Sequence, residues 1–554
     1  MRKRILFFAE SVTTAQVTRL VTLARCLDSS RYEVHFASAE FAPMAFEGTS
    51  FVRHRVASVD PEAAARALSA GRRIYDTKTI ERYVRDDVSV LERVAPALVV
   101  GDFRLSLSIS APLTGVPHAA LINAYWDPAR LARHLPVPDH PIVRLLGERL
   151  TAQYFPQAAP RAFAHFAAPV NRVRKKFGQA PLGGLPEVLT SGDHVLYPDP
   201  PELVPVPSLP AHHEYLGYVP WSPSSGGEDA LTALDGAHPL VYVTLGSSGR
   251  LDVLPKLVEG LAALDVTVLL STAGRAAPPS LPANFQTVPF VRGDLAARRA
   301  AFVVSNGGSS TGYQALAEGA PVLGIPSNLD QYLAMTAIEQ AGAGILVPAR
   351  TLTAAHVRES ATALLASTHL REKAREVKEQ IRRVSHVERF TNFVDRVTGC
   401  AAHERRASRA AVGPLAALLL LASALPSTTA RAEGAAPVTN EIRFSLSVGS
   451  PPGHVVCALF RRARWLEKPV QWQRVVIRKG RADCVFSGVS ADTYAISAFH
   501  DENDNTKLDT NFIGIPTESW CTSRDAPAFF GPPSFGAAKF LYRGDIMRLQ
   551  GVLR

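Results

Sequence analysis

Glycines, hydroxyl residues and a carboxylate–amide pair lie close together between positions 305 and 331, which read SNGGSSTGYQALAEGAPVLGIPSNLDQ. Gly307 and Gly308 would let the backbone approach an anion closely. Hydroxyl donors follow at the positive end of an expected helix dipole, and these are Ser309, Ser310 and Thr311. Asp330 and Gln331 end the stretch. The pattern predicts an anion-binding turn followed by a polar pair.

The elements that must position these residues form a predicted βαβ unit. The apolar run 300–304 (AAFVV) is expected to be a buried strand that leads into the glycine turn. A helix follows and is stopped by Gly319–Pro321, after which 322–325 (VLGI) forms the next strand. Asp330 and Gln331 then fall near the carboxyl end of a strand, where open α/β sheets bind their ligands.

This stretch resembles the nucleotide-sugar signature of family 1 glycosyltransferases with the GT-B fold, the UDP-glycosyltransferase and macrolide-glycosyltransferase type. Members carry a sequence like HGGxxTxxEALxxGVPxxxxPxxxDQ. The resemblance implies two Rossmann-like domains facing a cleft, with the glycine turn on the donor phosphates and the Asp-Gln pair on the sugar hydroxyls. The match runs through Gly307, Gly308, Thr311, Ala315, Leu316, Gly319, Pro321, Pro326, Asp330 and Gln331.

Two positions of the signature depart from the family. Asn306 stands where the family has a His that contacts a donor phosphate, and Gln314 replaces a Glu that holds the ribose hydroxyls. An amide still donates and accepts hydrogen bonds but carries no charge, so we expect nucleotide binding to be retained. The resemblance implies two further donor contacts. Ser247 lies in the turn after the apolar run 240–245, and Phe290 takes the place of an aromatic that stacks on uracil.

The N-terminal third has the pattern of another parallel α/β domain. Apolar runs at 4–9, 32–37 and 97–101 are separated by longer segments, which favours strands joined by crossover helices. The order resembles the acceptor-binding domain of the same family. In that family a His of the opening motif is the catalytic base, and Gln16 occupies its place here. A neutral amide cannot accept the proton of an acceptor hydroxyl.

Three explanations for Gln16 are open. Asp102 follows a predicted strand and matches the Asp that partners the family's His, so it could act as base directly or through a water. Another histidine, His134 or His118, could replace the missing one. Alternatively, the protein binds a nucleotide sugar without transferring it. A GT-B nucleotide-sugar 2-epimerase is a further alternative, although the N-terminal domain lacks an obvious set of the acidic and basic residues that such enzymes use.

The resemblance implies transfer of a hexosyl group, with inversion, from a UDP- or dTDP-sugar to a hydroxyl of a small or lipophilic acceptor. Backbone amides, hydroxyls and a helix dipole could stabilise the diphosphate leaving group. Because no Asp-x-Asp motif lies near these strands, we expect neither a cofactor nor a metal in the transferase. The net charge of +10 is not gathered in a Lys/Arg stripe interleaved with aromatics, so we expect no nucleic acid partner.

The transferase is expected to occupy the first 400 residues. An acceptor-binding domain spans 1–196, and a nucleotide-sugar-binding domain spans 238–400. Between them, 197–237 is rich in proline, which stops helices and favours an extended linker.

Segment 405–436 has the composition of a signal peptide placed inside the chain. Its apolar run, 410–425, lies between arginines and a row of small residues. The segment is either cleaved or acts as a single short membrane anchor. The transferase would then be cytoplasmic at the inner membrane, and the remainder would be exported to the periplasm. A buried core helix and a fusion of two neighbouring coding regions are the alternatives.

Residues 437–554 alternate polar and apolar residues in short runs between glycine and proline turns, which predicts a β-sandwich. Three of the five cysteines lie in this part: Cys457, Cys484 and Cys521. An exported domain allows disulfides, so we expect one disulfide with one thiol left over.

Segment 500–518 (HDENDNTKLDTNFIGIPTE) resembles a family of small exported bacterial domains of unknown function. Thr506 replaces the turn glycine of an EF-hand, and no Glu falls at the twelfth place, so the segment is not an EF-hand. An Asx-rich turn stabilised by its own side chains is the alternative to a calcium site. The oxygen ligands with calcium-loop spacing are Asp501, Asn503, Asn505 and Asp509.

Overall fold

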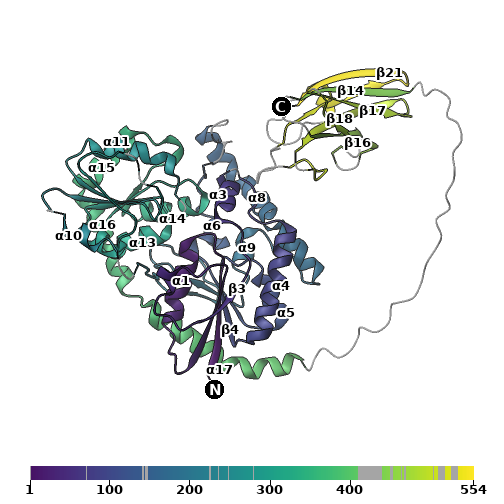
Figure 1. Ribbon diagram of the computed structural model, residues 1–554. Helices are drawn as coiled ribbons and strands as arrows, with labels where there is room; N and C mark the ends of the chain where they lie inside the picture. Colours follow the sequence, from purple (N-terminus) through teal and green to yellow (C-terminus); the bar gives the residue numbers. More distant parts are fainter. Residues whose placement is uncertain are drawn as a thin grey trace. The chain divides into compact units, whose positions relative to one another are not determined.

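The computed structural model divides the chain into two compact units, Met1–Val412 and Gly413–Arg554, and each is described by itself (Figure 1). The structure describes residues 2–69, 71–139, 143, 147–223, 226–234, 236–246, 249–276, 278, 280–409, 440–448, 453–462, 465–466, 469–478, 480–502, 504–509, 518–525 and 535–553.

The first sheet of the first unit has seven strands in the order β3-β2-β1-β4-β5-β6-β7, and every neighbouring pair is parallel. The central strands are nearly continuous apolar runs that are buried on both faces, as in parallel sheets covered by helices. The strands are β1 (Lys3–Ala9), β2 (Tyr32–Ser38), β3 (Val52–Arg55), β4 (Leu98–Asp102), β5 (His118–Leu121), β6 (His194–Tyr197) and β7 (His213–Tyr215).

Helices cover both faces of this sheet because successive residues of β1 point to opposite sides. One face packs on α1 (Thr14–Arg25) and α17 (His386–Arg409), and the other packs on α4 (Thr77–Val94) and α5 (Leu107–Thr114). The remaining helices of this half are α2 (Pro43–Phe46), α3 (Pro61–Ser69), η1 (Ala124–Trp126), α6 (Pro128–Leu131), α8 (Glu148–Lys176) and α9 (Leu185–Leu189).

The second sheet has six parallel strands in the order β10-β9-β8-β11-β12-β13. The strands are β8 (Leu240–Thr244), β9 (Thr267–Ser271), β10 (Phe285–Val288), β11 (Phe302–Ser305), β12 (Val322–Gly324) and β13 (Gly344–Leu346). Their helices are α10 (Glu228–Thr232), η2 (Leu251–Val253), α11 (Leu254–Ala262), α12 (Gly293–Arg299), α13 (Ser309–Ala317), α14 (Leu329–Gln340), η3 (Ala349–Thr351), α15 (Ala354–Ala366) and α16 (Thr368–Arg382).

The last helix of this unit, α17, returns from the second sheet to the first. Phe390 and Phe393 are fully buried in the cluster that contains β1, and the rings of Phe390 and Phe7 lie 6.1 Å apart. The helix therefore fastens the two halves together. The apolar run 410–425 lies outside the described residues. Among the helices that the structure does describe, none is long and apolar enough to cross a membrane.

The second unit is built of strands in two sheets, which confirms the predicted all-β class. One sheet has the order β17-β14-β21, and the other has β16-β15-β18-β19 with β20 paired to β18. The inner faces of both sheets share one apolar core. The elements are β14 (Glu441–Val448), β15 (His454–Arg461), β16 (Gln471–Val476), β17 (Arg481–Ser487), β18 (Asp492–Asp501), β19 (Trp520–Thr522), η5 (Ser523–Asp525), α18 (Phe535–Ala538), β20 (Phe540–Tyr542) and β21 (Ile546–Leu553).

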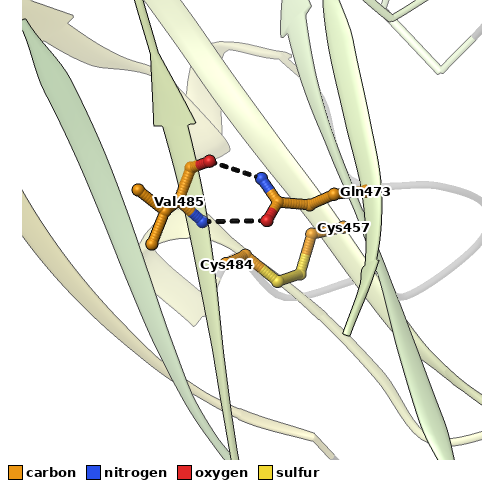
Figure 2. Close-up of a disulfide and its surroundings, with 4 residues drawn as sticks. All are labelled: Cys457, Gln473, Cys484 and Val485. Atoms are coloured by element: carbon orange, nitrogen blue, oxygen red, sulfur yellow. Dashed lines mark hydrogen bonds between the residues drawn. A yellow bond between two sulfur atoms is a disulfide. The ribbon is translucent and has the colours of Figure 1, made fainter. Parts of the chain in front are cut away.

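A disulfide between Cys457 on β15 and Cys484 on β17 joins the two sheets (Figure 2). Beside it, the Gln473 amide bonds both backbone groups of Val485, which ties β16 to β17 (Figure 2). Cys521 is buried and takes no part in this disulfide. The prediction of one disulfide with one cysteine left over is confirmed.

Replacing Cys457 with serine is expected to lower the free energy of unfolding of the second unit by about 3–4 kcal/mol, because the bond closes a loop of 27 residues. Thermal unfolding of the whole chain, with and without reductant, measures this loss. Cys26→Ser is the control, since Cys26 is a free thiol of the first unit. A second-unit transition that responds neither to reductant nor to Cys457→Ser would contradict the prediction.

Candidate functional site

The glycine turn lies at the carboxyl end of β11 and leads directly into α13. Gly307 has a φ of +77°, a conformation that favours glycine, and Gly308 is the N-cap residue of α13. The turn is fixed by its own polar groups: the Gly307 amide donates to Ser305 Oγ, and the Gly308 amide donates to Asn306 Oδ1, both at 3.1 Å. Ser309 is buried in the first turn of α13. The positive end of the helix dipole therefore faces the predicted anion site.

A second turn comes from the neighbouring strand β8. Thr244 pairs in register with Ser305, so the turns that follow β8 and β11 lie at the same edge of the sheet. A Cβ added at Gly246 would meet Asn306 Nδ2 at 3.9 Å. Asn306 therefore lies beside the β8 turn, where its family position predicts a phosphate contact. Ser247, the predicted donor contact in that turn, lies outside the described residues.

The polar pair Asp330 and Gln331 belongs to the first turn of α14, the helix that follows β12. Asn328 caps this helix and accepts the Gln331 amide at 3.1 Å. Gln331 Oε1 accepts from both the amide and the hydroxyl of Ser327. Gln331 Nε2 is buried and has no hydrogen-bond partner in the part of the chain that the structure describes. A buried N–H group without an acceptor destabilises the folded protein unless a bound molecule accepts its hydrogen bond.

Asp330 is bound by the other half of the unit. Trp126 Nε1 donates to its Oδ1 at 2.8 Å, and the Tyr125 hydroxyl donates to the same oxygen at 3.1 Å. The Tyr125 hydroxyl also lies 3.4 Å from Ser309 Oγ. Desolvation by the surrounding protein raises the pKa of Asp330, and the two donors oppose that rise. These contacts bring the Asp-Gln pair and the first turn of α13 to the boundary between the two halves.

Asp102 ends β4 on the opposite side of this boundary. It is 1% exposed, and Arg19 holds both of its oxygens, Nε at 2.9 Å from Oδ2 and Nη2 at 3.0 Å from Oδ1. Burial raises the pKa of Asp102 to about 6, while Arg19 pulls it down and the charge of Asp330 adds a smaller rise. Asp102 and Asp330 are therefore close enough to influence each other.

Gln16 does not contact Asp102. Its Oε1 accepts the Thr13 amide at 3.1 Å and completes a capping box at the start of α1. Arg19 follows three residues later on the same helix face and takes the place beside Asp102. Arg19 is not among the predicted site residues, although its spacing of three from Gln16 indicates that both lie on one helix face.

A chain of buried hydrogen bonds runs from Arg19 into the second half. Arg19 Nη1 donates to Asn123 Oδ1 at 2.8 Å, and Asn123 Nδ2 donates to Asp199 Oδ1 at 2.8 Å. The Tyr313 hydroxyl of α13 donates to that same Asp199 oxygen at 2.7 Å. The sequence gives no local signal for this network, because its members come from separate segments of the chain.

Neither alternative histidine lies at this edge. His118 begins β5, and its neighbour in register is Val99, three residues before Asp102. That places its backbone about 10 Å along the strand from Asp102. Its ring reaches as far as Gly101, where an added Cβ would lie 3.4 Å from Nε2. Burial lowers its pKa to about 4. His134 contacts Gln340 at the carboxyl end of α14, about 15 Å from Asp330 at the other end.

The four remaining predicted donor contacts all belong to the second half: Phe290, Ser310, Thr311 and Gln314. Gln314 Nε2 donates to the Trp221 carbonyl and to Ser222 Oγ, each at 2.9 Å. Its amide is thus engaged with the segment that joins the halves. Phe290 is 37% exposed, and its ring lies 3.0 Å from the position of a Cβ at Gly274. Ser310 is exposed and Thr311 half-buried on α13.

The loop predicted as a calcium site is occupied by its own hydrogen bonds. Asp501 accepts from the amides of Asn505 and Thr506, and Asn505 Nδ2 donates to both oxygens of Asp509 at 3.1 Å. Asn503 lies outside the described residues. Among the residues that are described, no group of three or more His, Cys, Asp or Glu is placed to hold a metal ion. The geometry favours the Asx-rich turn.

Two parallel α/β halves, with a glycine turn at a helix N-terminus and a polar pair on the next helix, are the architecture of a GT-B glycosyltransferase. Residues 255–385 match the family model "Erythromycin biosynthesis protein CIII-like, C-terminal domain". The fold is similar to the solved structure of glycosyltransferase VinC in complex with DTDP, with a TM-score of 0.52 and 22% identity over 72% of this chain and 99% of that one. The predicted GT-B fold is confirmed, and so is the all-β class of the C-terminal part; the apolar run of the predicted signal-like segment between them lies outside the described residues.

Two relatives of similar sequence identify more specifically the family to which the chain belongs. The chain is 42% identical over 379 residues to the PGL/p-HBAD biosynthesis glycosyltransferase of Mycobacterium tuberculosis (strain ATCC 25177 / H37Ra), which is 68% of this chain and 88% of the relative. It is 43% identical over 374 residues to the PGL/p-HBAD biosynthesis rhamnosyltransferase of Mycobacterium bovis (strain BCG / Pasteur 1173P2), 67% of this chain and 83% of the relative. The chain therefore belongs to the family of PGL/p-HBAD biosynthesis glycosyltransferases, and it is a hexosyltransferase.

The second unit has its own match. Residues 447–549 fit the family model "Uncharacterized protein conserved in bacteria (DUF2141)". The predicted combination of a family 1 glycosyltransferase with a separate bacterial β domain is confirmed.

Proposed function

We propose that this glycosyltransferase moves a hexosyl group, with inversion, from a UDP- or dTDP-sugar to a hydroxyl of a small or lipophilic acceptor. The observation that carries the proposal is the buried Nε2 of Gln331, a donor without a partner among the described residues, beside a carboxylate at the boundary of the halves. A sugar hydroxyl would supply the acceptor that this amide needs.

The donor phosphates would lie against the turns after β8 and β11. Gly307 and Gly308 would let the phosphates approach the backbone closely, and the hydroxyls of Ser309–Thr311 and the dipole of α13 would stabilise the charge that develops on the leaving diphosphate. Asn306 would add an amide donor. The site as proposed uses no metal and no other cofactor. Asp330 and Gln331 would orient the sugar ring.

Asp102 would act as the base on the acceptor side, directly or through a water. The acceptor oxygen forms a bond to the anomeric carbon, the bond from that carbon to the phosphate oxygen breaks, and the hydroxyl proton passes to Asp102. Its raised pKa, about 6, makes it a stronger base than an ordinary aspartate. Gln16 would contribute to this site only indirectly. Its capping bond fixes where α1 begins, and that start places Arg19 beside Asp102.

The names of the relatives favour a deoxyhexose as the transferred sugar. One relative is described as a rhamnosyltransferase, and the structure of VinC was solved with DTDP. A dTDP-activated rhamnose and a lipophilic hydroxyl acceptor are therefore the first pair to try. UDP-glucose is the second donor to test.

Gln331→Glu is expected to raise the donor KM about tenfold, because it exchanges the buried Nε2 donor for an oxygen and keeps the acceptor that Ser327 needs. Release of nucleoside diphosphate from dTDP-rhamnose or UDP-glucose, in the presence of a lipophilic phenol or alcohol, measures the rate. Inhibition by the free nucleoside diphosphate should be unchanged, since that molecule lacks the transferred hexosyl group. An unchanged donor KM would remove Gln331 from the sugar site.

The same assay tests the function as a whole. The wild-type chain should release nucleoside diphosphate only when donor and acceptor are both present. Binding of a nucleotide sugar without release for any acceptor would contradict transfer to acceptors of this class.

We also propose that the transferase comprises domains 1–196 and 238–400 joined by the linker 197–237, and that it stays in the cytoplasm. Segment 405–436, with the apolar run 410–425, would then lead to an exported domain at 437–554. The disulfide of that domain supports an oxidising compartment. Finding Cys457 and Cys484 reduced in protein taken directly from cells would contradict export.

A further inference from the structure

One segment of the first half reaches the second half and forms hydrogen bonds with it at both of the segment's ends. We call residues 124–139 the strap. At its start, Tyr125 and Trp126 bond Asp330 on α14. At its end, Asp139 accepts from the Tyr332 hydroxyl and from the backbone and side chain of Arg350. Both ends of the strap therefore bind side chains in the first turn of α14, namely Asp330 and Tyr332.

The two bonds at the start of the strap have a specific chemistry. An indole N–H can only donate, and the Tyr125 hydroxyl donates here as well. Both donors converge on one oxygen, Oδ1, so they fix the rotation of the Asp330 carboxylate. The two donors are buried, whereas Asp330 is exposed, which leaves its carboxylate open to a ligand.

Tyr125 also connects the two helices that carry the donor site. Its hydroxyl lies 3.4 Å from Ser309 Oγ at the start of α13 and 3.1 Å from Asp330 at the start of α14. The phosphate side and the sugar side of the site are thus spanned by one residue of the opposite half. Trp126 is in turn packed against the ring of Phe163 on α8, with ring centres 6.3 Å apart.

We propose that Tyr125 and Trp126 are positioning residues for the donor sugar: they orient the Asp330 carboxylate toward the sugar hydroxyls, so that the acceptor half takes part in selecting the sugar. This inference rests on the proposed function, because it assumes that Asp330 binds the donor sugar.

The experiment compares two dissociation constants in the whole chain, one for dTDP-rhamnose or UDP-glucose and one for the matching free nucleoside diphosphate. The ratio of these two dissociation constants reports how much the sugar contributes to binding. Trp126→Phe removes the N–H and keeps an aromatic ring, and we expect the nucleotide sugar to bind about tenfold more weakly while the free nucleoside diphosphate binds as before. Tyr125→Phe should weaken the nucleotide sugar similarly and also lower kcat.

Phe163→Leu is the matched control. It trims the ring that packs on Trp126 but leaves the N–H in place, so a merely structural role of Trp126 would make both variants behave alike. We expect Phe163→Leu to keep the wild-type ratio of dissociation constants. Equal ratios in wild type, Trp126→Phe and Tyr125→Phe, in protein that binds and turns over the donor, would overturn the inference and leave the proposed function intact. A wild-type chain that binds no nucleotide sugar would instead overturn the proposed function.

Discussion

Replacing Asp102 with asparagine is expected to lower kcat by about 10²–10⁴-fold and to leave the donor KM nearly unchanged. That range is what a positioned general base contributes. The amide of the variant would keep the size of the side chain and an oxygen for Arg19, but it could not accept the proton of the acceptor hydroxyl. The donor site is built from other residues on the second half, so donor binding should survive. Release of nucleoside diphosphate under saturating donor and acceptor measures the change.

The same role predicts an acid limb in the pH profile of kcat/KM near pH 6. Burial raises the pKa of Asp102 to about 6, and only the ionised carboxylate can take a proton. Activity should therefore rise as the pH passes upward through about 6 and fall below it. Arg19 pulls this pKa down, so Arg19→Met should move the limb to higher pH. A limb that stays in place in Arg19→Met would show that another group titrates.

Two controls separate catalysis from folding. Asp193 accepts the backbone amide of His118 at 2.8 Å, at the opposite edge of the same sheet, so Asp193→Asn should keep the wild-type kcat. Asp102→Asn leaves the buried Arg19 without a charged partner, which destabilises a fold, and thermal unfolding must show that the variant is folded at the assay temperature. Wild-type turnover by folded Asp102→Asn would remove Asp102 from the mechanism.

The parts of the fold that could be predicted from the sequence are those with local signals. The run 300–304, the glycine turn and the helix stop at Gly319 are consecutive in the chain, and each reflects a short-range preference of the backbone. The alternation of buried and exposed residues in β14 is local in the same sense. Both α/β halves and the all-β class followed from such patterns.

The contacts that define the candidate site could not be predicted, because they join residues far apart in sequence. Trp126 and Asp330 are separated by 204 positions, and Asn123 and Asp199 by 76. Nothing near either residue indicates its partner. Gln16 is different, since Thr13 and Gln16 have the spacing of a capping box, and that local signal explains Gln16 without reference to a missing base. The roles of the predicted site residues stay predictions until the variants are measured.

Replacing Arg104 with methionine is expected to cost about 3–5 kcal/mol of unfolding free energy, the largest stability loss we predict. The Arg104 side chain is fully buried, as are its two acidic partners: Nη1 bonds Glu10 at 3.0 Å, and Nη2 bonds Asp87 at 2.8 Å. Its guanidinium also lies 3.8 Å from the ring centre of Tyr83. Removing it leaves two buried carboxylates without their cation, which costs far more than losing an exposed pair.

Urea unfolding of the whole chain, read on the transition of the first unit, measures this loss, and Arg85→Met is the control. Arg85 pairs with Glu81 at 3.8 Å on the surface, with its own side chain 73% exposed, so its removal should cost less than about 1 kcal/mol. Equal losses in the two variants would contradict a buried ionic cluster at Arg104.

The loss in Arg104→Met should depend on pH in a defined direction. Burial already raises the pKa of Asp87, and Arg104 opposes that rise, so the pKa climbs further without Arg104. Between the ordinary pKa of aspartate, about 4, and this raised value, the folded variant holds a proton that the unfolded chain has released. The folded state then binds more protons, and its stability falls as the pH rises. The difference from wild type should be greatest at neutral pH and shrink toward pH of about 4–5, whereas a cavity alone would give a loss that pH does not change.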